Sequence, residues 1–303
     1  MTVAAASLTM GPVLFHWPEQ QKRDFWFRIA DEAPVDTVYL GEVVCSKRTP
    51  FFDHSLEAVA ERLQRGGKRV VWSTMAEVVS KLDRKVIESF CGFDEVEAND
   101  VSALYFLKGR PHRIGQYLNV YNEETIRHLA GNGANHFCLP VELPLATVSE
   151  LARAAREMDA GIEVQVFGKV SLALSARCYH ARAHGRTKDN CLFVCENDPD
   201  GMDLKTHSGK PFLSVNGIQT LSEKYLNLST ELTGLQAAGV SAFRLSPHSC
   251  NMVEIASAYR QLLDGAISAG ELDARLDEIG VPAQRMNGFV HGQPGFAYVT
   301  HQH

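Results

Sequence analysis

Four of the seven cysteines lie in segments rich in polar and basic residues, where thiols could bind a metal. They are Cys45, Cys178, Cys191 and Cys195. The last three follow the spacing C-x12-C-x3-C within one stretch of chain, whereas Cys45 comes from a distant one. Thiolates are preferred ligands of zinc, copper(I) and iron–sulfur clusters. The spacing therefore indicates a soft-metal site assembled from two separate parts of the chain.

Basic residues gather around these cysteines although the chain as a whole is acidic, with 30 Lys and Arg against 36 Asp and Glu and a net charge of −6. The flanking cations are Lys47, Arg48, Arg177, Arg182, Arg186 and Lys188. A 4Fe-4S cluster held by four thiolates is negatively charged, so nearby cations stabilise it. Zinc remains an alternative, but only Cys191 and Cys195 form the short knuckle typical of structural zinc. A metal-free basic loop is the third interpretation.

The remaining cysteines are predicted to differ in role. Cys91 and Cys138 have apolar neighbours and are expected to be buried packing residues, as free cysteines usually are. Cys250 follows a predicted strand and is the alternative to Cys45 as the fourth ligand.

A cysteine nucleophile is a further alternative, because His180 and His184 closely follow Cys178. The sequence contains no GxSxG, HExxH, P-loop or EF-hand motif, so common hydrolase and nucleotidase mechanisms lose support.

Short apolar runs alternate with longer segments of helical periodicity along most of the chain. Strands are predicted at 9–15, 35–40, 69–73, 95–98, 114–120, 136–139, 163–167, 212–215 and 242–245. Helices are predicted at 19–33, 55–65, 75–90, 123–132, 147–160 and 252–269. About eight strand–helix units without a GxGxxG fingerprint favour an α/β fold with a parallel, TIM-like barrel over a doubly wound sheet. A barrel that is incomplete or distorted is the alternative.

The domain organisation that follows is one barrel-like domain over 1–303. Residues 168–209 are predicted as an inserted, Cys- and Arg-rich loop that carries three of the cysteines, and 280–303 as an irregular C-terminal tail. A structureless segment of that length inside a domain is usually functional or disordered.

Polar residues at the ends of predicted strands are the other candidates, because active sites of β/α barrels lie at the carboxyl ends of strands. Glu42, Glu142 and Arg244 are candidate catalytic groups. Arg244 lies in an apolar strand, so we expect it to meet an acid, either a buried Glu or a ligand carboxylate. Candidate substrate-binding residues are Asn119, Tyr121 and Asn122.

Composition limits the partners. The acidic balance argues against a nucleic-acid binder, which would carry a basic stripe. No apolar run approaches the roughly 18 residues of a membrane span, and seven cysteines in 303 residues do not form a secreted disulfide scaffold. A cytosolic protein is expected.

Six blocks of the sequence resemble the ubiquinone-biosynthesis branch of the collagenase-like peptidase family of uncertain catalytic type. They are VYLGEVVCSKR (38–48), LPVEL (139–143), ALSARCYHAR (173–182), GRTKDNCLFVC (185–195), VNGIQT (215–220) and FRLSP (243–247). Peptidase-type members have an Asn-Arg-Gly run where this chain has Thr187-Lys188-Asp189-Asn190, which separates it from that branch.

The resemblance implies that Cys45, Cys178, Cys191 and Cys195 bind a 4Fe-4S cluster. It further implies oxygen-independent hydroxylation of a ubiquinone precursor during anaerobic growth, by a heterodimer with a UbiU-like paralogue. A small-molecule oxygen donor such as prephenate would replace O2. The alternatives are a metal-stabilised electron-transfer or structural subunit, or a collagenase-like peptidase.

Overall fold

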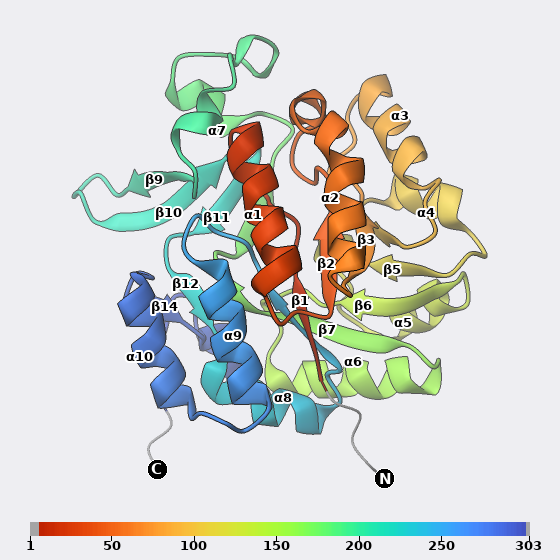
Figure 1. Cartoon of the computed structure of the whole chain (residues 1–303), viewed down its shortest axis with the longest axis vertical. Coiled ribbons are helices and arrows are strands. Elements are labelled where there is room, and N and C mark those ends of the chain that lie inside the picture. Colours follow the sequence, from red (N-terminus) through yellow and green to blue (C-terminus); the bar gives the residue numbers. More distant parts are fainter. Residues whose placement is uncertain (1–5, 301–303) are drawn as a thin grey trace.

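Eight parallel strands with buried side chains form a closed barrel surrounded by helices (Figure 1). The computed structural model describes residues 6–300. The barrel strands are β1 (Ser7–Met10), β2 (Thr37–Leu40), β3 (Arg69–Ser73), β4 (Val96–Ala98), β5 (His112–Ile114), β6 (Ala134–Cys138), β7 (Gly161–Gly168) and β13 (Ala242–Leu245). β13 pairs with both β1 and β7, which closes the ring. The expected TIM-like fold is therefore confirmed, and the barrel is complete.

Helices follow the strands around the outside of the barrel. They are α1 (Glu19–Glu32), α2 (Asp53–Arg65), α3 (Lys81–Phe90), α4 (Val101–Leu107), α5 (Glu123–Ala130), α6 (Leu145–Glu157), α8 (Leu232–Ala238), α9 (Met252–Leu263) and α10 (Ala269–Ile279). Ser80 is the N-cap residue of α3, and its side chain and that of Asp83 form a reciprocal capping box. Apolar helix faces pack on the strands, as in Ile29 of α1 and Leu151 of α6.

An insertion between β7 and α8 carries three of the four candidate cysteines. It contains β8 (Ser171–Leu174), α7 (Tyr179–Ala183), β9 (Met202–Lys205), β10 (Pro211–Asn216) and β11 (Gln219–Ser222). The four strands form an antiparallel sheet in the order β8-β11-β10-β9, beside the barrel (Figure 1). β12 (Tyr225–Asn227) then returns antiparallel to β7, and β14 (Arg285–Met286) pairs with it.

Several expected elements were wrong. Residues 114–120 are not a strand: β5 ends at Ile114, and a 3-10 turn, η2 (Gln116–Leu118), leads to Asn119 in the left-handed region at φ 54°. The run 212–215 is a strand of the inserted sheet rather than of the barrel. The helices α4 and α8, of seven residues each, and α10, of 11 residues, were not predicted.

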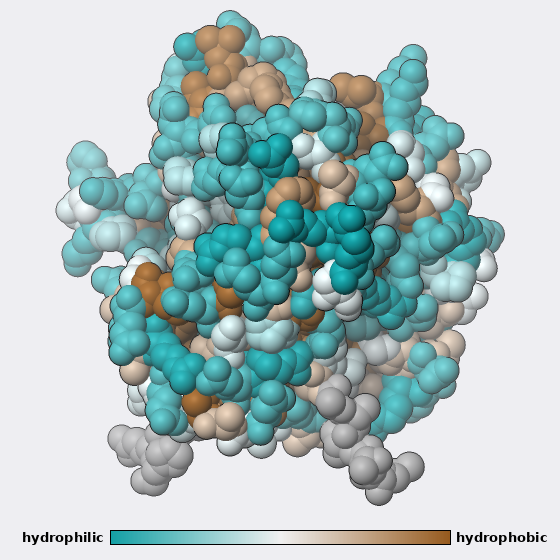
Figure 2. All heavy atoms as spheres, viewed as in Figure 1, coloured by the Kyte–Doolittle hydropathy of each residue, from teal (hydrophilic) through white to brown (hydrophobic). Residues whose placement is uncertain are grey.

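Residues 168–209, expected as a loop, contain β8, α7 and β9 together with the short turns η3 (Lys188–Asn190) and η4 (Val194–Asn197). The expected tail contains β14 and η6 (Gly288–His291), and its last three residues lie outside the described part. Within residues 6–300, no helix has the length and apolar character needed to cross a membrane. The face in Figure 2 is mostly hydrophilic over α1 and α9, with apolar surface above α7.

Candidate functional site

The four predicted metal-binding cysteines line a single pocket at the carboxyl ends of the barrel strands, hereafter the thiol pocket. Its lining comprises Cys45, Lys47, Arg48, Cys178, His180, Ala181, Lys188, Cys191, Phe193, Val194, Cys195, Gly217 and Ile218. Cys45 follows β2, Cys178 immediately precedes α7, Cys191 directly follows η3, and Cys195 lies within η4. The three other cysteines do not line this pocket. Cys250, the alternative fourth ligand, instead has its Sγ 3.8 Å from the Sδ of Met252.

Glu42 holds the loop that presents Cys45. Its carboxylate accepts the backbone N–H groups of Val44 and Cys45, both at 3.0 Å, and it is 7% exposed. Gly41, just before it, has φ 142°, and a Cβ there would lie 2.2 Å from the carbonyl oxygen of Ser73. The loop after β2 therefore needs glycine at its first residue and a carboxylate at its second. The structure places Glu42, a candidate catalytic group, in a positioning role.

Arg48 is the buried cation of the thiol pocket. Its guanidinium donates to the carbonyl oxygen of Leu14 at 2.9 Å and to Oδ1 of Asn216 at 3.0 Å. Burial raises the pKa of the Cys45 and Cys195 thiols, while the positive charge of Arg48 lowers it. The guanidinium thus favours thiolate, the form that binds a metal.

Lys47 connects the loop after β2 to the insertion, because its Nζ donates to the carbonyl oxygen of Lys188 at 2.7 Å. Two cationic side chains, Lys47 and Lys188, line the pocket beside Arg48. The predicted basic surroundings are therefore present for these three residues.

The spacing of the ligand atoms distinguishes this pocket from a single-ion site. In the described part of the chain, one group of three or more His, Cys, Asp or Glu ligand atoms lies within 4.8 Å of one another: His180, His184 and Asp198. The four thiols are not such a group. Sulfur atoms around one tetrahedral zinc would be separated by about 3.8 Å, given zinc–sulfur bonds of about 2.3 Å. At least one pair of the four sulfur atoms is therefore separated by more than 4.8 Å.

A chain of hydrogen bonds leads from Arg48 to a second cavity. Asn216, which accepts from Arg48, donates to Oε1 of Gln219 at 3.2 Å, and Nε2 of Gln219 donates to the hydroxyl of Tyr117 at 2.9 Å. Asn216 and Gln219 are buried, and they come from β10 and β11 of the inserted sheet. The sheet therefore links the thiol pocket to Tyr117 of η2.

Tyr117 lines this second cavity, hereafter the tyrosine pocket, which has a volume of about 360 Å³. It lies beyond the ends of β5 and β6 and against β8, and is lined by Gln116, Tyr117, Asn119, Tyr121, Pro140, Val141, Glu142, Ser171, Leu172, Ala173 and Leu174. The Tyr121 hydroxyl donates to the Glu142 carboxylate. Burial and this carboxylate raise the pKa of Tyr121 to about 12, so its phenol remains protonated.

Three of the four predicted residues of this region thus meet in the tyrosine pocket: Asn119, Tyr121 and Glu142. Asn122 has another role, because its side-chain oxygen accepts from the backbone N–H of Thr125 and caps α5. The signal for capping, an Asn before a helical run, was present in the sequence.

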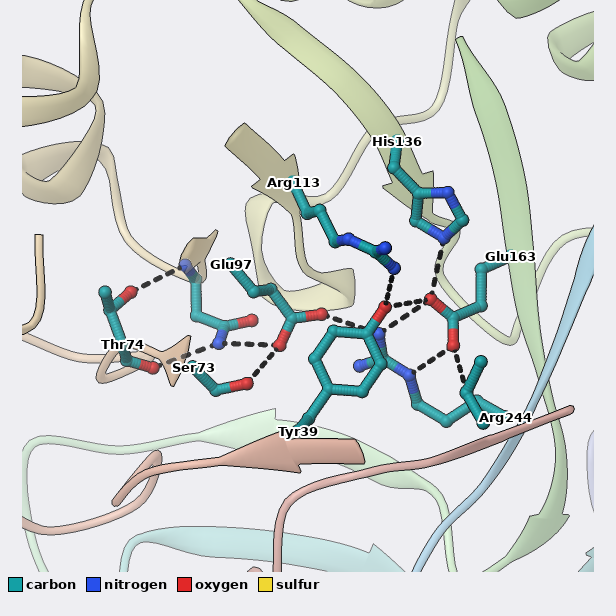
Figure 3. Close-up of polar contacts among 10 residues, drawn as sticks. Tyr39, Ser73, Thr74, Glu97, Arg113, His136, Glu163 and Arg244 are labelled. Atoms are coloured by element: carbon teal, nitrogen blue, oxygen red, sulfur yellow. Dashed lines mark hydrogen bonds and ion pairs between the residues drawn. The ribbon is translucent and has the colours of Figure 1, made fainter. Parts of the chain in front are cut away.

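Arg244 lies inside the barrel and pairs with two buried glutamates (Figure 3). Its guanidinium contacts Glu97 at 2.6 Å and Glu163 at 2.9 Å. It also lies over the Tyr39 ring, with 3.9 Å between the guanidinium carbon and the ring centroid. The acid expected for this arginine is thus a buried Glu of the chain itself. Burial alone would raise the pKa of Glu163, but Arg244 and His136 outweigh it and hold that pKa well below its ordinary value.

Sequence reasoning missed the rest of this network. The Tyr39 hydroxyl donates to Glu163 at 2.6 Å and accepts from Arg113 at 2.8 Å, and His136 contacts Glu163 at 2.9 Å (Figure 3). These side chains come from β2, β5, β6 and β7. The positive charges of Arg113 and Arg244 balance the negative charges of Glu97 and Glu163, and burial lowers the pKa of His136. The available signal was the polar residues Glu97, Arg113, His136 and Glu163 within short, mostly apolar strands.

Fold and site together define a class: a β/α barrel whose insertion after the seventh strand closes a cysteine-lined pocket over the carboxyl ends of the strands. A model of peptidase family U32 matches residues 26–298, nearly the whole chain. The chain belongs to this family.

Solved structures resemble the chain only distantly. An uncharacterised protein of B. cereus is 9% identical, with 86% of this chain and 65% of that chain covered and a TM-score of 0.46. The spore coat polysaccharide biosynthesis protein spsE of Bacillus subtilis is 10% identical, with 92% and 71% covered and a TM-score of 0.44. A DAHP synthase of Thermotoga maritima is 11% identical, with 92% and 72% covered and a TM-score of 0.43. Likenesses of this size say nothing about activity.

Proposed function

We propose that this chain is a UbiV-type subunit that binds a 4Fe-4S cluster and takes part in oxygen-independent hydroxylation of a ubiquinone precursor. One observation carries the proposal: Cys45, Cys178, Cys191 and Cys195, which lie in two distant stretches of sequence, line one pocket together with three cations. Four thiolates with neighbouring positive charge are the ligand set of such a cluster.

The donor set fits a cluster better than zinc. All four ligands are sulfur, which both groups accept, but the sulfur atoms are spaced more widely than a single tetrahedral ion requires. The N–H groups and cations around the pocket suit a group with net negative charge. When bound, the cluster would supply one-electron redox chemistry.

The chain's own residues have definite tasks in this proposal. Glu42 fixes the loop of Cys45, and the positive charge of Arg48 opposes the burial that raises the pKa of the Cys45 and Cys195 thiols. Asn216 donates to Gln219, and Gln219 donates to the hydroxyl of Tyr117, which positions this side chain in the lining of the tyrosine pocket. Ring binding in that pocket, with Asn119, Tyr121 and Glu142 as polar contacts, would place substrate beside the same inserted sheet.

The partner and the oxygen source belong to the proposal on the resemblance alone. They are a UbiU-like paralogue in a heterodimer and a small-molecule donor such as prephenate. In the alternative, this chain is a metal-stabilised electron-transfer or structural subunit, and the partner performs the chemistry.

Peptidase activity is the second candidate, favoured by the family match over residues 26–298. The local geometry near His248 does not assemble a nucleophile and a base. The Ser249 hydroxyl donates a hydrogen bond to Asp200 rather than to His248, and Nε2 of His248 accepts one from the backbone N–H of Lys169. A peptidase assay on collagen-derived peptides with the purified chain tests this candidate directly.

Anaerobic purification tests the cluster. We expect a brown protein with about four iron and four sulfide per chain and a broad absorption band near roughly 400 nm. Alanine at Cys45, Cys178, Cys191 or Cys195 should abolish the iron, because each removes one ligand. Alanine at Cys138 or Cys250 is the matched control and should leave the iron in place. A colourless zinc protein, or full iron in the Cys45→Ala variant, would contradict the assignment.

Ubiquinone formation in anaerobic cells that lack this chain separates the cluster-dependent hydroxylase from a structural subunit. Expression of the wild-type chain should restore ubiquinone, and the iron-free Cys178→Ala variant should not. Full rescue by an iron-free but folded variant would reduce the cluster to a dispensable group.

A further inference from the structure

Two cavities of similar size adjoin each other beside the inserted sheet, and both are lined by Leu172 of β8. One is the tyrosine pocket. The other, hereafter the apolar groove, has a volume of about 380 Å³ and is lined by Leu172, Pro211, Phe212, Leu213, Ser222, Glu223, Lys224, Met286, Phe289, Gly295 and Phe296. The two cavities share this one residue and therefore lie next to each other at β8.

The tyrosine pocket offers neutral hydrogen-bonding groups and one carboxylate. No Lys, Arg or His is among its lining residues, whereas Lys47, Arg48, His180 and Lys188 line the thiol pocket. Glu142 would repel an anionic ligand and accept a hydrogen bond from a neutral hydroxyl group. Tyr117 and Tyr121 provide flat apolar faces against which a ring can pack. The pocket therefore suits an uncharged, hydroxylated ring.

Large hydrophobic side chains of the apolar groove are exposed to solvent. Phe212, Phe296 and Leu172 are 61%, 69% and 44% exposed. Lys224 connects two segments that line the groove, because its Nζ donates to the carbonyl oxygen of Phe296 at 2.8 Å. Exposed apolar residues that gather around a cavity commonly mark a binding site.

We infer that the tyrosine pocket and the apolar groove form one site for an amphiphile, with a neutral hydroxylated ring beside Tyr117 and Glu142 and a hydrocarbon chain passing Leu172 into the groove. This inference rests on the proposed function, and it adds where the two halves of such a substrate bind.

Calorimetric titration of the purified full chain with 4-methylphenol, 4-hexylphenol and 4-hexylbenzoate, all kept below micelle formation, tests the site. We expect 4-hexylphenol to bind at least tenfold more tightly than 4-methylphenol, since each buried methylene adds to the affinity. The benzoate should bind at least tenfold more weakly than 4-hexylphenol. Equal affinity for the three probes would overturn the inference.

Variants assign the two halves of the ligand. Phe212→Ser combined with Phe296→Ser should remove most of the hexyl advantage and leave 4-methylphenol unchanged. Glu142→Gln should weaken both phenols about tenfold and lessen the discrimination against the benzoate. Tyr105→Ser is the matched control, because Tyr105 is an aromatic on α4 that is 81% exposed and lines neither cavity. Loss of binding in the control, or none in the two site variants, would contradict the assignment.

The same titration on the Cys178→Ala variant separates this inference from the cluster. Binding of 4-hexylphenol to an iron-free chain supports the site independently of redox function. Conversely, a brown, active wild-type protein that binds no phenol would overturn the site while the proposed function stands.

Discussion

Two buried arginines, Arg48 and Arg244, have different environments that their local sequences distinguish only in part. Arg244 lies within the apolar run AFRL, and from this alone an acidic partner could be expected. The partners Glu97 and Glu163 could not be named, because pairing depends on which strands face each other across the barrel. Arg48 could be assigned to the cysteines by proximity in sequence, but its contacts with Leu14 and Asn216 depend on the closed fold.

Removing Arg244 tests how far the barrel interior depends on its charge balance. Arg244→Met leaves Glu97 and Glu163 buried without their cation, so we expect a loss of about 3–5 kcal/mol in unfolding free energy. Urea denaturation at pH 7.5 measures it. Arg153→Met is the control, because Arg153 pairs with Glu150 and Glu157 at an exposed site. Its replacement should lower the unfolding free energy by about 1 kcal/mol or less. Similar losses in the two variants would refute the role of the network.

At the scale of elements, the loop after β2 has the strictest backbone requirement in the site. Gly41→Ala places a methyl group against the Ser73 carbonyl oxygen at a φ that L residues rarely adopt. We expect a loss of roughly 3 kcal/mol in unfolding free energy and a lower iron content, because Glu42 and Cys45 follow directly. Thermal denaturation and iron analysis measure the two effects.

Gly67→Ala is the control for that loop. Gly67 also has a positive φ, 76°, but a Cβ there meets nothing within 4 Å. Its replacement should cost about 1–2 kcal/mol and leave the iron content unchanged. Equal behaviour of the two variants would show that the contact with Ser73 does not position the loop.

The periodicity of the sequence identified seven of the barrel strands at least in part, because their apolar runs and spacing repeat. The prediction failed where a segment has a strand-like sequence but does not pair with a barrel strand. The run 114–120 resembles a strand in sequence, but the strand ends at Ile114 and residues after it line the tyrosine pocket. The strand β10 is likewise strand-like in sequence, and only its antiparallel partners β9 and β11 show that it lies outside the barrel.

For the molecule as a whole, buried histidines predict sensitivity to acid. Burial lowers the pKa of His16 to about 4 and also lowers that of His112, His136 and His248. In the unfolded chain these groups bind protons near pH 6.5, so the unfolded state binds more protons below that pH. Stability is therefore full above pH 6.5 and falls as the pH drops, by up to about 1.4 kcal/mol per pH unit for each histidine.

Urea denaturation at pH 7.5, 6.0 and 5.0 measures this loss. His112→Gln should reduce the slope by the contribution of one histidine, because burial lowers the pKa of His112 in the folded state. Stability that stays constant from pH 7.5 to 5.0 would contradict the expectation. Below about pH 4.5, protonation of Glu163 should add a further loss, since its pKa is depressed in the folded state.

The thiol pocket also constrains the order of events during synthesis. Cys45 emerges from the ribosome about 130 residues before Cys178, and β1 can pair with β13 only after residue 242 is made. At roughly 5–20 residues per second, the first thiol waits on the order of ten seconds for its partners. During that interval it is a free, reactive cysteine on an unclosed chain. If the four thiols bind the proposed cluster, Cys45 has to stay reduced until the other three ligands have been made.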